Sequence, residues 1–160
     1  MSMQTTSRSP QRQTSAAKPT IIVCDDEELI RWSLCQHLEG EGYATVSVDN
    51  GKACVEAVAK HAPGLVLMDL RMPIMDGMTA LRTIRESGSE VPVVVLTAHG
   101  GVESAIQATR LGATAYLSKP FDLREVSLAV RKGIEQGQLR DEVHYLRSRS
   151  QAGYGDFVGQ

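Results

Sequence analysis

Three short, continuously apolar runs constrain the fold of this chain more than any other feature of its sequence. They are residues 21–24 (IIVC), 65–68 (LVLM) and 93–96 (VVVL). Strands that are apolar on both faces are typical of the centre of a parallel sheet covered by helices on both sides. Helical patterns alternate with these runs, so the sequence predicts repeated βα units around a parallel sheet.

Two further segments complete a set of five strands. Residues 43–48 alternate between apolar and polar or large side chains, which is typical of a half-covered edge strand, and residues 115–118 form a short fifth strand. We therefore predict an α/β fold with five βα units in a doubly wound parallel sheet, with the strand order 2-1-3-4-5.

Apolar residues at helical spacing indicate how the helices pack on this sheet. The last helix begins at a capping box formed by Asp122 and Glu125. The fourth helix carries small side chains and is flanked by glycines, so we expect it to be held only lightly and to move. The apolar positions of the first, third, fourth and last helices are, in turn, Ile30, Leu34 and Leu38; Met78, Leu81 and Ile84; Val102, Ala105, Ile106 and Leu111; Val126 and Val130.

The overall charge excludes some classes of partner. The chain has 17 Lys and Arg against 19 Asp and Glu, and this balance gives no basic excess for general binding to nucleic acid or an anionic membrane. No apolar run approaches the roughly 20 residues that a membrane-spanning helix needs, and no secretory signal is evident. We therefore expect a soluble, cytoplasmic protein.

The three cysteines and four histidines lack metal-binding spacings, so we interpret the cysteines as buried thiols.

Polar side chains follow four of the predicted strands. Asp25 and Asp26 follow the first, Asp69 the third, Thr97 ends the fourth, and Lys119 follows the fifth. Ligands of open parallel sheets bind at this edge, and three converging carboxylates repel one another unless a hard cation such as Mg²⁺ lies among them. Each residue alone is more often a helix cap, a turn residue or a surface lysine. Their coincidence indicates a phosphoryl-transfer site with Asp69 as the candidate nucleophile.

These residues resemble those of the receiver domain of bacterial two-component response regulators. The resemblance covers roughly residues 20–133 and implies a flavodoxin-like fold in which Asp69 accepts a phosphoryl group from a sensor histidine kinase. It implies that Asp26, Asp69 and the backbone carbonyl of Arg71 bind Mg²⁺ directly, that Asp25 acts largely through water, and that Lys119 pairs with the phosphoryl oxygens. The segments that carry the resemblance are Asp25-Asp26, Asp69, residues 71–77 (RMPIMDG), Leu96-Thr97-Ala98 and residues 116–121 (YLSKPF).

The same resemblance implies a switch. Thr97 would move toward the phosphoryl oxygens and make room for the ring of Tyr116. In receivers this movement shifts the surface of the fourth helix, fifth strand and fifth helix between two pre-existing conformations.

Other segments resemble receivers of the NtrC type, which activate transcription with the nitrogen-type alternative sigma factor. Residues 27–31 (EELIR) and 97–101 (TAHGG) carry this likeness. Leu139, Val143 and Leu146 lie at heptad spacing and favour a dimerising linker helix, although Gly133 and Gly137 weaken it. We predict a disordered leader over residues 1–19, the receiver over 20–133, a helical linker with a homodimer contact over 134–150, and the start of a missing ATPase domain over 151–160.

The sequence also limits what this chain does by itself. It lacks a G-x-x-x-x-G-K-[ST] motif, so we expect no ATP hydrolysis and no enzymatic activity beyond self-catalysed phosphoryl acceptance and slow autodephosphorylation. It has no room for a helix-turn-helix outside the receiver, so DNA binding would belong to further domains.

Two readings from other classes conflict with residues of this chain, and one alternative remains within the receiver class. A haloacid-dehalogenase-type phosphatase also uses an Asp after a strand, but it needs a second acid two residues later, where this chain has Arg71. A flavin-binding module needs a phosphate-cradling loop where this chain has the acidic residues 25–28. Within the receiver class, the alternative is a stand-alone phosphorelay protein without an effector domain.

Overall fold

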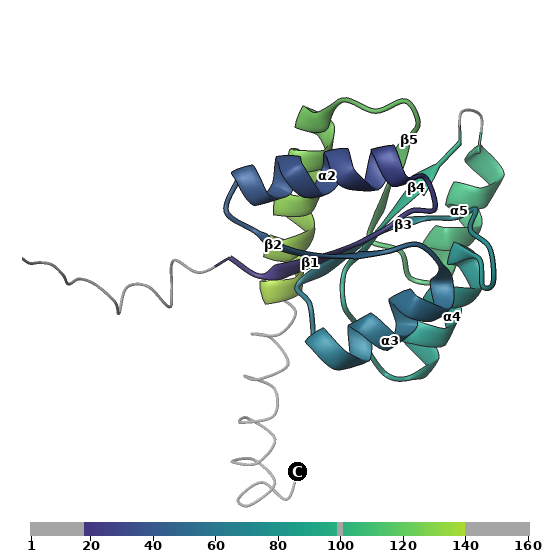
Figure 1. The fold of residues 1–160 in the computed structure, drawn as a ribbon. Helices are drawn as coiled ribbons and strands as arrows, with labels where there is room; N and C mark the ends of the chain where they lie inside the picture. Colours follow the sequence, from purple (N-terminus) through teal and green to yellow (C-terminus); the bar gives the residue numbers. More distant parts are fainter. Residues whose placement is uncertain (1–17, 99–100, 140–160) are drawn as a thin grey trace, which may run out of the picture.

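The apolar segments come together in a single parallel sheet of five strands (Figure 1). The computed structural model describes residues 18–98 and 101–139. The strands lie in the order β2-β1-β3-β4-β5, and every neighbouring pair is parallel, which confirms the predicted fold class and strand order. Their bounds are β1 (Thr20–Cys24), β2 (Ala44–Val48), β3 (Leu65–Asp69), β4 (Val93–Thr97) and β5 (Ala115–Ser118).

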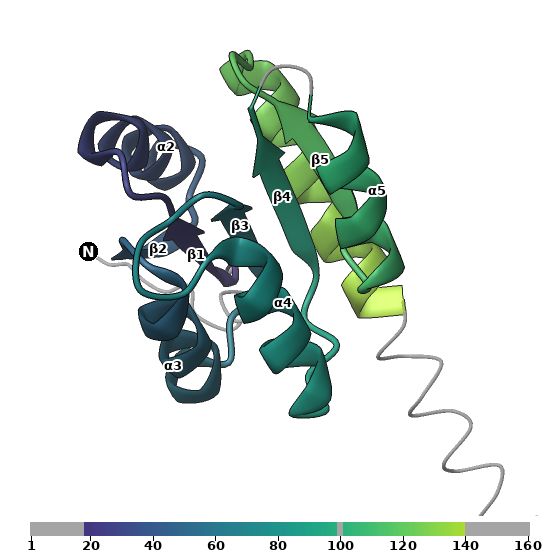
Figure 2. The ribbon, with the colours of Figure 1, turned by 90° about the vertical axis from the view of Figure 1, so that its right-hand side faces the viewer.

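Helices cover both faces of this sheet (Figures 1 and 2). One core cluster joins the sheet to α3, α4 and α5, and the other joins it to α2 and the last helix. The helices are α2 (Glu28–Gly40), α3 (Gly51–His61), α4 (Gly77–Glu86), α5 (Val102–Arg110) and a last helix that is described over residues 123–139. None of the helices within the described ranges is long and apolar enough to cross a membrane.

The strands differ in burial as their sequences predict. All residues of β3 and β4 are buried, and so are the last four of β1, because helices lie on both faces of these strands. The edge strand β2 contains no fully buried residue. On the helices, Leu34, Leu38, Leu81, Ile84, Val126 and Val130 are buried as expected.

Helix α5 packs through smaller side chains than its apolar positions indicate. Ala105 and Ala108, one helical turn apart, are buried against the sheet. Val102 and Ile106 point outward and are 61% and 49% exposed. The thin apolar contact agrees with a weakly held helix, and the two exposed side chains leave an apolar face on its outer side.

The last helix begins and packs through specific local contacts. The amide of Asp122 donates to Glu125 Oε1 at 2.9 Å, and Asp122 Oδ1 accepts from the amide of Arg124 at 2.8 Å, so the predicted helix start is confirmed. A Cβ on Gly133 would lie 2.5 Å from Leu65 Cδ1, and one on Gly137 would lie 2.9 Å from Pro92 Cγ. These glycines therefore allow the helix to lie close to the sheet. Their low helix propensity predicts only that they weaken the helix, and it does not predict this close packing.

The predicted domain boundaries stay predictions. The last helix runs through residue 133 without a break, and Ile134 is partly buried against the core that contains Val126 and Val130. Residues 1–17 of the predicted leader, residues 140–150 of the predicted linker and all of residues 151–160 lie outside the described residues.

A polar cluster ties α2 to the last helix. Ser127 Oγ donates to Glu41 Oε2 at 2.8 Å, and His37 Nε2 lies 2.6 Å from the same oxygen of Ser127. Since the single hydroxyl proton of Ser127 is used toward Glu41, His37 Nε2 acts as the donor. The serine therefore joins two residues of the α2 end to a helix almost ninety positions later in the chain.

We expect Ser127→Ala to lower the free energy of unfolding by about 1 kcal/mol, because two hydrogen bonds are lost while His37 and Glu41 regain contact with water. Urea unfolding measures the change. The control is Ser118→Ala at an exposed position of β5. Equal stability of the Ser127 and Ser118 variants would show that the cluster adds nothing to the packing of the helix.

Candidate functional site

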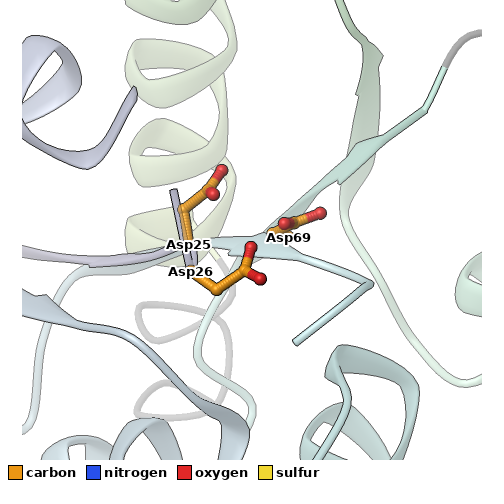
Figure 3. Close-up of side chains that lie close together, drawn as sticks. All are labelled: Asp25, Asp26 and Asp69. Carbon is orange, nitrogen blue, oxygen red and sulfur yellow. The ribbon is translucent and has the colours of Figure 1, made fainter. Parts of the chain in front are cut away.

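Three carboxylates meet at the carboxyl ends of β1 and β3 (Figure 3). Asp25 and Asp26 directly follow β1, and Asp69 is the last residue of β3. Each offers an oxygen, and these oxygens all lie within 4.8 Å of one another. Asp25 is fully buried, Asp69 is 6% exposed, and Asp26 is exposed.

Lys119 supplies the positive charge nearest to these acids. Its Nζ lies 3.0 Å from Asp25 Oδ2 and 3.4 Å from Asp69 Oδ2. The backbone amide of Lys119 donates to the carbonyl of Thr97 at 2.7 Å, so β4 fixes the point from which the lysine reaches inward. The sequence-predicted lysine therefore lies among the predicted acids.

Backbone amides orient two of the carboxylates. The amide of Glu27 donates to Asp25 Oδ1 at 2.9 Å, and the amide of Arg71 donates to Asp69 Oδ1 at 3.3 Å. Each amide follows its acid by two residues, at the turn where the chain leaves the strand. Both acids are thus held by the local chain as well as by Lys119.

The electrostatics of the site favour an added cation. Burial raises the pKa of the Asp69 carboxyl to about 6, and the negative charge of Asp25 adds to the rise, while Lys119 and the Arg71 amide oppose it. Burial alone would lower the pKa of Lys119, but its hydrogen bond to Asp25 and the nearby carboxylates raise it above its ordinary value. The single positive charge of Lys119 therefore does not fully neutralise the negative charges of the neighbouring carboxylates.

The donor set fits a hard divalent cation. Within residues 18–98 and 101–139, Asp25, Asp26 and Asp69 are the one group of three His, Cys, Asp or Glu residues with ligand atoms close enough to share an ion. All the donors are carboxylate oxygens, which Mg²⁺ prefers, and the exposed Asp26 leaves an approach from solvent. Asp26, Asp69, Arg71, Thr97 and Lys119 line one open pocket of about 710 Å³.

Comparison with known proteins gives this arrangement a family. The family model of the response regulator receiver domain matches residues 21–131. The chain belongs to this family.

The similar receivers come from transcriptional regulators. The chain is 37% identical to the regulatory protein AtoC of Escherichia coli K12, over 79% of this chain and 27% of AtoC. It is 39% identical to the DNA-binding transcriptional regulator NtrC of the same strain, over 76% of this chain and 26% of NtrC. The crystal structure of the receiver domain of NtrX from Brucella abortus superimposes with a TM-score of 0.69 and 32% identity, covering 72% of this chain and 98% of that one. This receiver spans about a quarter of the length of the curated relatives.

The two expected switch residues of the receiver differ in burial. Thr97 is buried, and its hydroxyl donates to the carbonyl of Leu117 at 3.4 Å. Tyr116 is 50% exposed on β5, and its partner in the strand register is Val95. Thr97 therefore borders the acidic pocket in this structure, whereas the Tyr116 ring lies on the surface of the sheet edge.

Two residues of the receiver site have structural roles that sequence reasoning missed. Glu27 Oε1 lies 3.7 Å from Lys119 Nζ. The sequence signal for this contact was only that Glu27 belongs to the acidic run after β1. A Cβ on Gly77 would lie 2.3 Å from the carbonyl oxygen of Asp69, so α4 begins this close to the end of β3 only because residue 77 is glycine. The RMPIMDG segment contains this glycine, but its spacing does not reveal the contact.

We expect Asp69→Asn to stabilise the metal-free receiver at pH 8 by roughly 3 kcal/mol relative to the wild type. The pKa of Asp69 is higher in the folded chain than the ordinary 3.8. The folded chain therefore holds this proton more tightly than the unfolded chain, and wild-type stability falls as the pH rises from about 4 through about 6. The amide variant escapes that loss, so the two proteins should differ least below pH 4.

Urea unfolding at pH 4, 6 and 8 in the presence of a chelator measures this difference. The control is Asp49→Asn, because Asp49 is exposed and lies outside the acidic pocket. An Asp69→Asn variant that is no more stable than the wild type at pH 8 would contradict the account of the crowded acids.

Proposed function

We propose that this receiver accepts a phosphoryl group from a sensor histidine kinase onto Asp69, in the presence of Mg²⁺, and acts as a phosphorylation-dependent signalling switch. The observation that carries the proposal is the position of the Asp69 carboxylate, 3.4 Å from Lys119 Nζ and beside Asp25 and Asp26 at the edge of the sheet. The polar pocket reaches this carboxylate from solvent.

The chemistry requires little of the protein beyond positioning. An oxygen of the Asp69 carboxylate attacks the phosphorus of a phosphohistidine, an O–P bond forms, and the N–P bond breaks. The imidazole leaves neutral because its other nitrogen carries a proton. Water later hydrolyses the acyl phosphate and restores the carboxylate. The Arg71 amide, which donates to Asp69 Oδ1, leaves Oδ2 as the candidate attacking oxygen.

The metal would be held by Asp26, Asp69 and the backbone carbonyl of Arg71, with Asp25 acting largely through water. When bound, Mg²⁺ supplies positive charge that neutralises the phosphoryl oxygens. Lys119 would then pair with a phosphoryl oxygen in place of its contact with the Asp69 carboxylate. Asp25 keeps its hydrogen bond from the Glu27 amide during that exchange, which holds the buried acid in place.

The signal would leave the site through Thr97 and Tyr116. The Thr97 hydroxyl would give up its long contact with the Leu117 carbonyl and donate to a phosphoryl oxygen, and the exposed Tyr116 ring would turn inward. The surface formed by α5, β5 and the last helix would respond by a shift between two conformations. Exposed apolar side chains on that surface support the proposal; they are Val102, Ile106, Tyr116 and Leu128.

We propose transcription control as the output. The similarity to AtoC and NtrC supports an NtrC-type protein with ATPase and DNA-binding domains that follow this receiver and work with the nitrogen-type alternative sigma factor. Leu139 is 60% exposed at the end of the described helix and would start a homodimer contact through residues 134–150. The receiver itself would bind neither DNA nor membrane and would act in the cytoplasm. The alternative is a stand-alone phosphorelay receiver without an effector domain.

Light scattering tests this switch. We expect beryllofluoride with Mg²⁺, which imitates the phosphoryl-aspartate, to change the oligomeric state of the wild-type chain and to leave Asp69→Asn unchanged. The matched control is Asp76→Asn, which lies in the same pocket but caps α4, a role that asparagine also fills. Wild-type protein that neither binds beryllofluoride nor changes size would contradict the proposal.

A second variant tests the part that Lys119 plays in the switch. We expect Lys119→Ala to keep the fold and to abolish the beryllofluoride-dependent size change, because the ion pairs of Lys119 with Asp25 and Asp69 are lost. Circular dichroism checks the fold, and light scattering checks the response. A Lys119→Ala protein that switches as the wild type does would remove the lysine from the mechanism.

A further inference from the structure

The first residue of α3 presses against the loop that leads from the phosphoacceptor to α4. The amide of Gly51 donates to the carbonyl of Met75 at 2.8 Å. A Cβ on Gly51 would lie 2.3 Å from that same oxygen and 3.0 Å from the carbonyl oxygen of Asp76. Backbone atoms cannot give way as a flexible side chain can, so only glycine fits at this contact.

The loop is strained at its tip. Ile74 has a φ of 69°, and the amide of Met75 donates to the carbonyl of Pro73 at 2.7 Å, which is a three-residue turn centred on a β-branched residue with positive φ. The Ile74 side chain is 78% exposed, so its own packing does not offset the strain. Contacts elsewhere in the loop must hold this conformation.

Anchors on both sides provide that restraint. At the neck of the loop, the amide of Gly77 donates to the carbonyl of Leu70 at 3.0 Å. At the tip, Gly51 holds Met75. Between them, Cys24 Sγ lies 3.2 Å from Met72 Sδ and 3.5 Å from the carbonyl of Asn50. The turn before α3 and the end of β1 therefore both contact the loop.

The loop so held contains part of the candidate site. Arg71 lies two residues after Asp69, its amide donates to Asp69 Oδ1, and its carbonyl is a proposed Mg²⁺ ligand. Asp76 lines the same pocket at the other end of the loop. A shift of Met75 away from α3 would therefore reach Arg71 through the four residue steps of backbone that separate them.

We propose that Gly51 is a positioning residue for the phosphoryl-transfer site: its contact with the Met75 carbonyl fixes the loop of residues 70–76 and thereby the geometry offered to Mg²⁺. The inference rests on the proposed function, since it assigns Gly51 a role at that metal site. Gly51 touches neither the metal nor the phosphoryl group, and acts only through the loop.

Comparison of Gly51→Ala with Gly40→Ala tests the proposal. Gly40 is also a terminal residue of a helix, the last one of α2, but a Cβ there would meet nothing within 4 Å. We expect Gly51→Ala to weaken Mg²⁺ binding by roughly tenfold or more in calorimetric titration, as is typical when a support of a metal ligand is removed, and Gly40→Ala to bind as the wild type does. In metal-free protein, the amide resonances of residues 70–76 should shift in the Gly51 variant alone.

A rescue variant distinguishes positioning from general destabilisation. Ile74→Gly relieves the strained turn, so the Met75 carbonyl can move away from an alanine at position 51 while Arg71 keeps its place. We expect Gly51→Ala combined with Ile74→Gly to recover most of the lost Mg²⁺ affinity. Lost affinity that Ile74→Gly does not restore, or Gly51→Ala binding equal to that of Gly40→Ala, would overturn the role of Gly51.

The wild-type chain gives a test that does not depend on the folding of a variant. If the loop and the metal are coupled through Gly51, Mg²⁺ should slow hydrogen exchange of the Gly51 amide by about tenfold. The reason is that Mg²⁺ and the hydrogen bond from Gly51 to the Met75 carbonyl would stabilise the same conformation of residues 70–76. Unchanged exchange on Mg²⁺ binding would overturn the inference. Wild-type protein that does not bind Mg²⁺ at all would instead overturn the proposed function.

Discussion

Repulsion among three carboxylates at the carboxyl edge of the sheet is the constraint on which the candidate site depends. Asp25 and Asp69 are almost fully removed from water, and Lys119 is the cation placed between them. The fold keeps this unfavourable arrangement because the apolar strands β1 and β3 are packed on both faces, which fixes where their last residues lie. A site that holds excess negative charge is ready for a divalent cation and, with it, for a phosphoryl group.

The precision of the site comes from backbone contacts around those acids. Gly77 allows α4 to begin beneath the Asp69 carbonyl, and Gly51 allows α3 to hold the neighbouring loop. Such contacts transmit displacement well because backbone atoms in a packed region have little room to move. On the opposite face of the sheet, Gly133 and Gly137 allow the last helix to lie close to the side chains of Leu65 and Pro92.

Much of this architecture could be predicted from the sequence because its causes are local. The apolar runs predicted the strands and their burial. The polar side chains at the strand ends predicted the site residues Asp25, Asp26, Asp69, Thr97 and Lys119. The remaining features depend on partners far away in the chain. How the helices pack decides three such features, and no short sequence pattern encodes that packing. They are the contact between His37 and Ser127, the exposure of Ile106, and the close approach of Gly51 to Met75.

The central claim is that Asp69 is the phosphoacceptor, and chemical trapping tests it most directly. The chain is incubated with acetyl phosphate and Mg²⁺, the acyl phosphate is reduced with borohydride, and peptides are mapped by mass spectrometry. We predict that Asp69 alone is converted to homoserine and that a chelator prevents the conversion. Conversion at Asp25 or Asp26, or conversion that persists without Mg²⁺, would contradict the account.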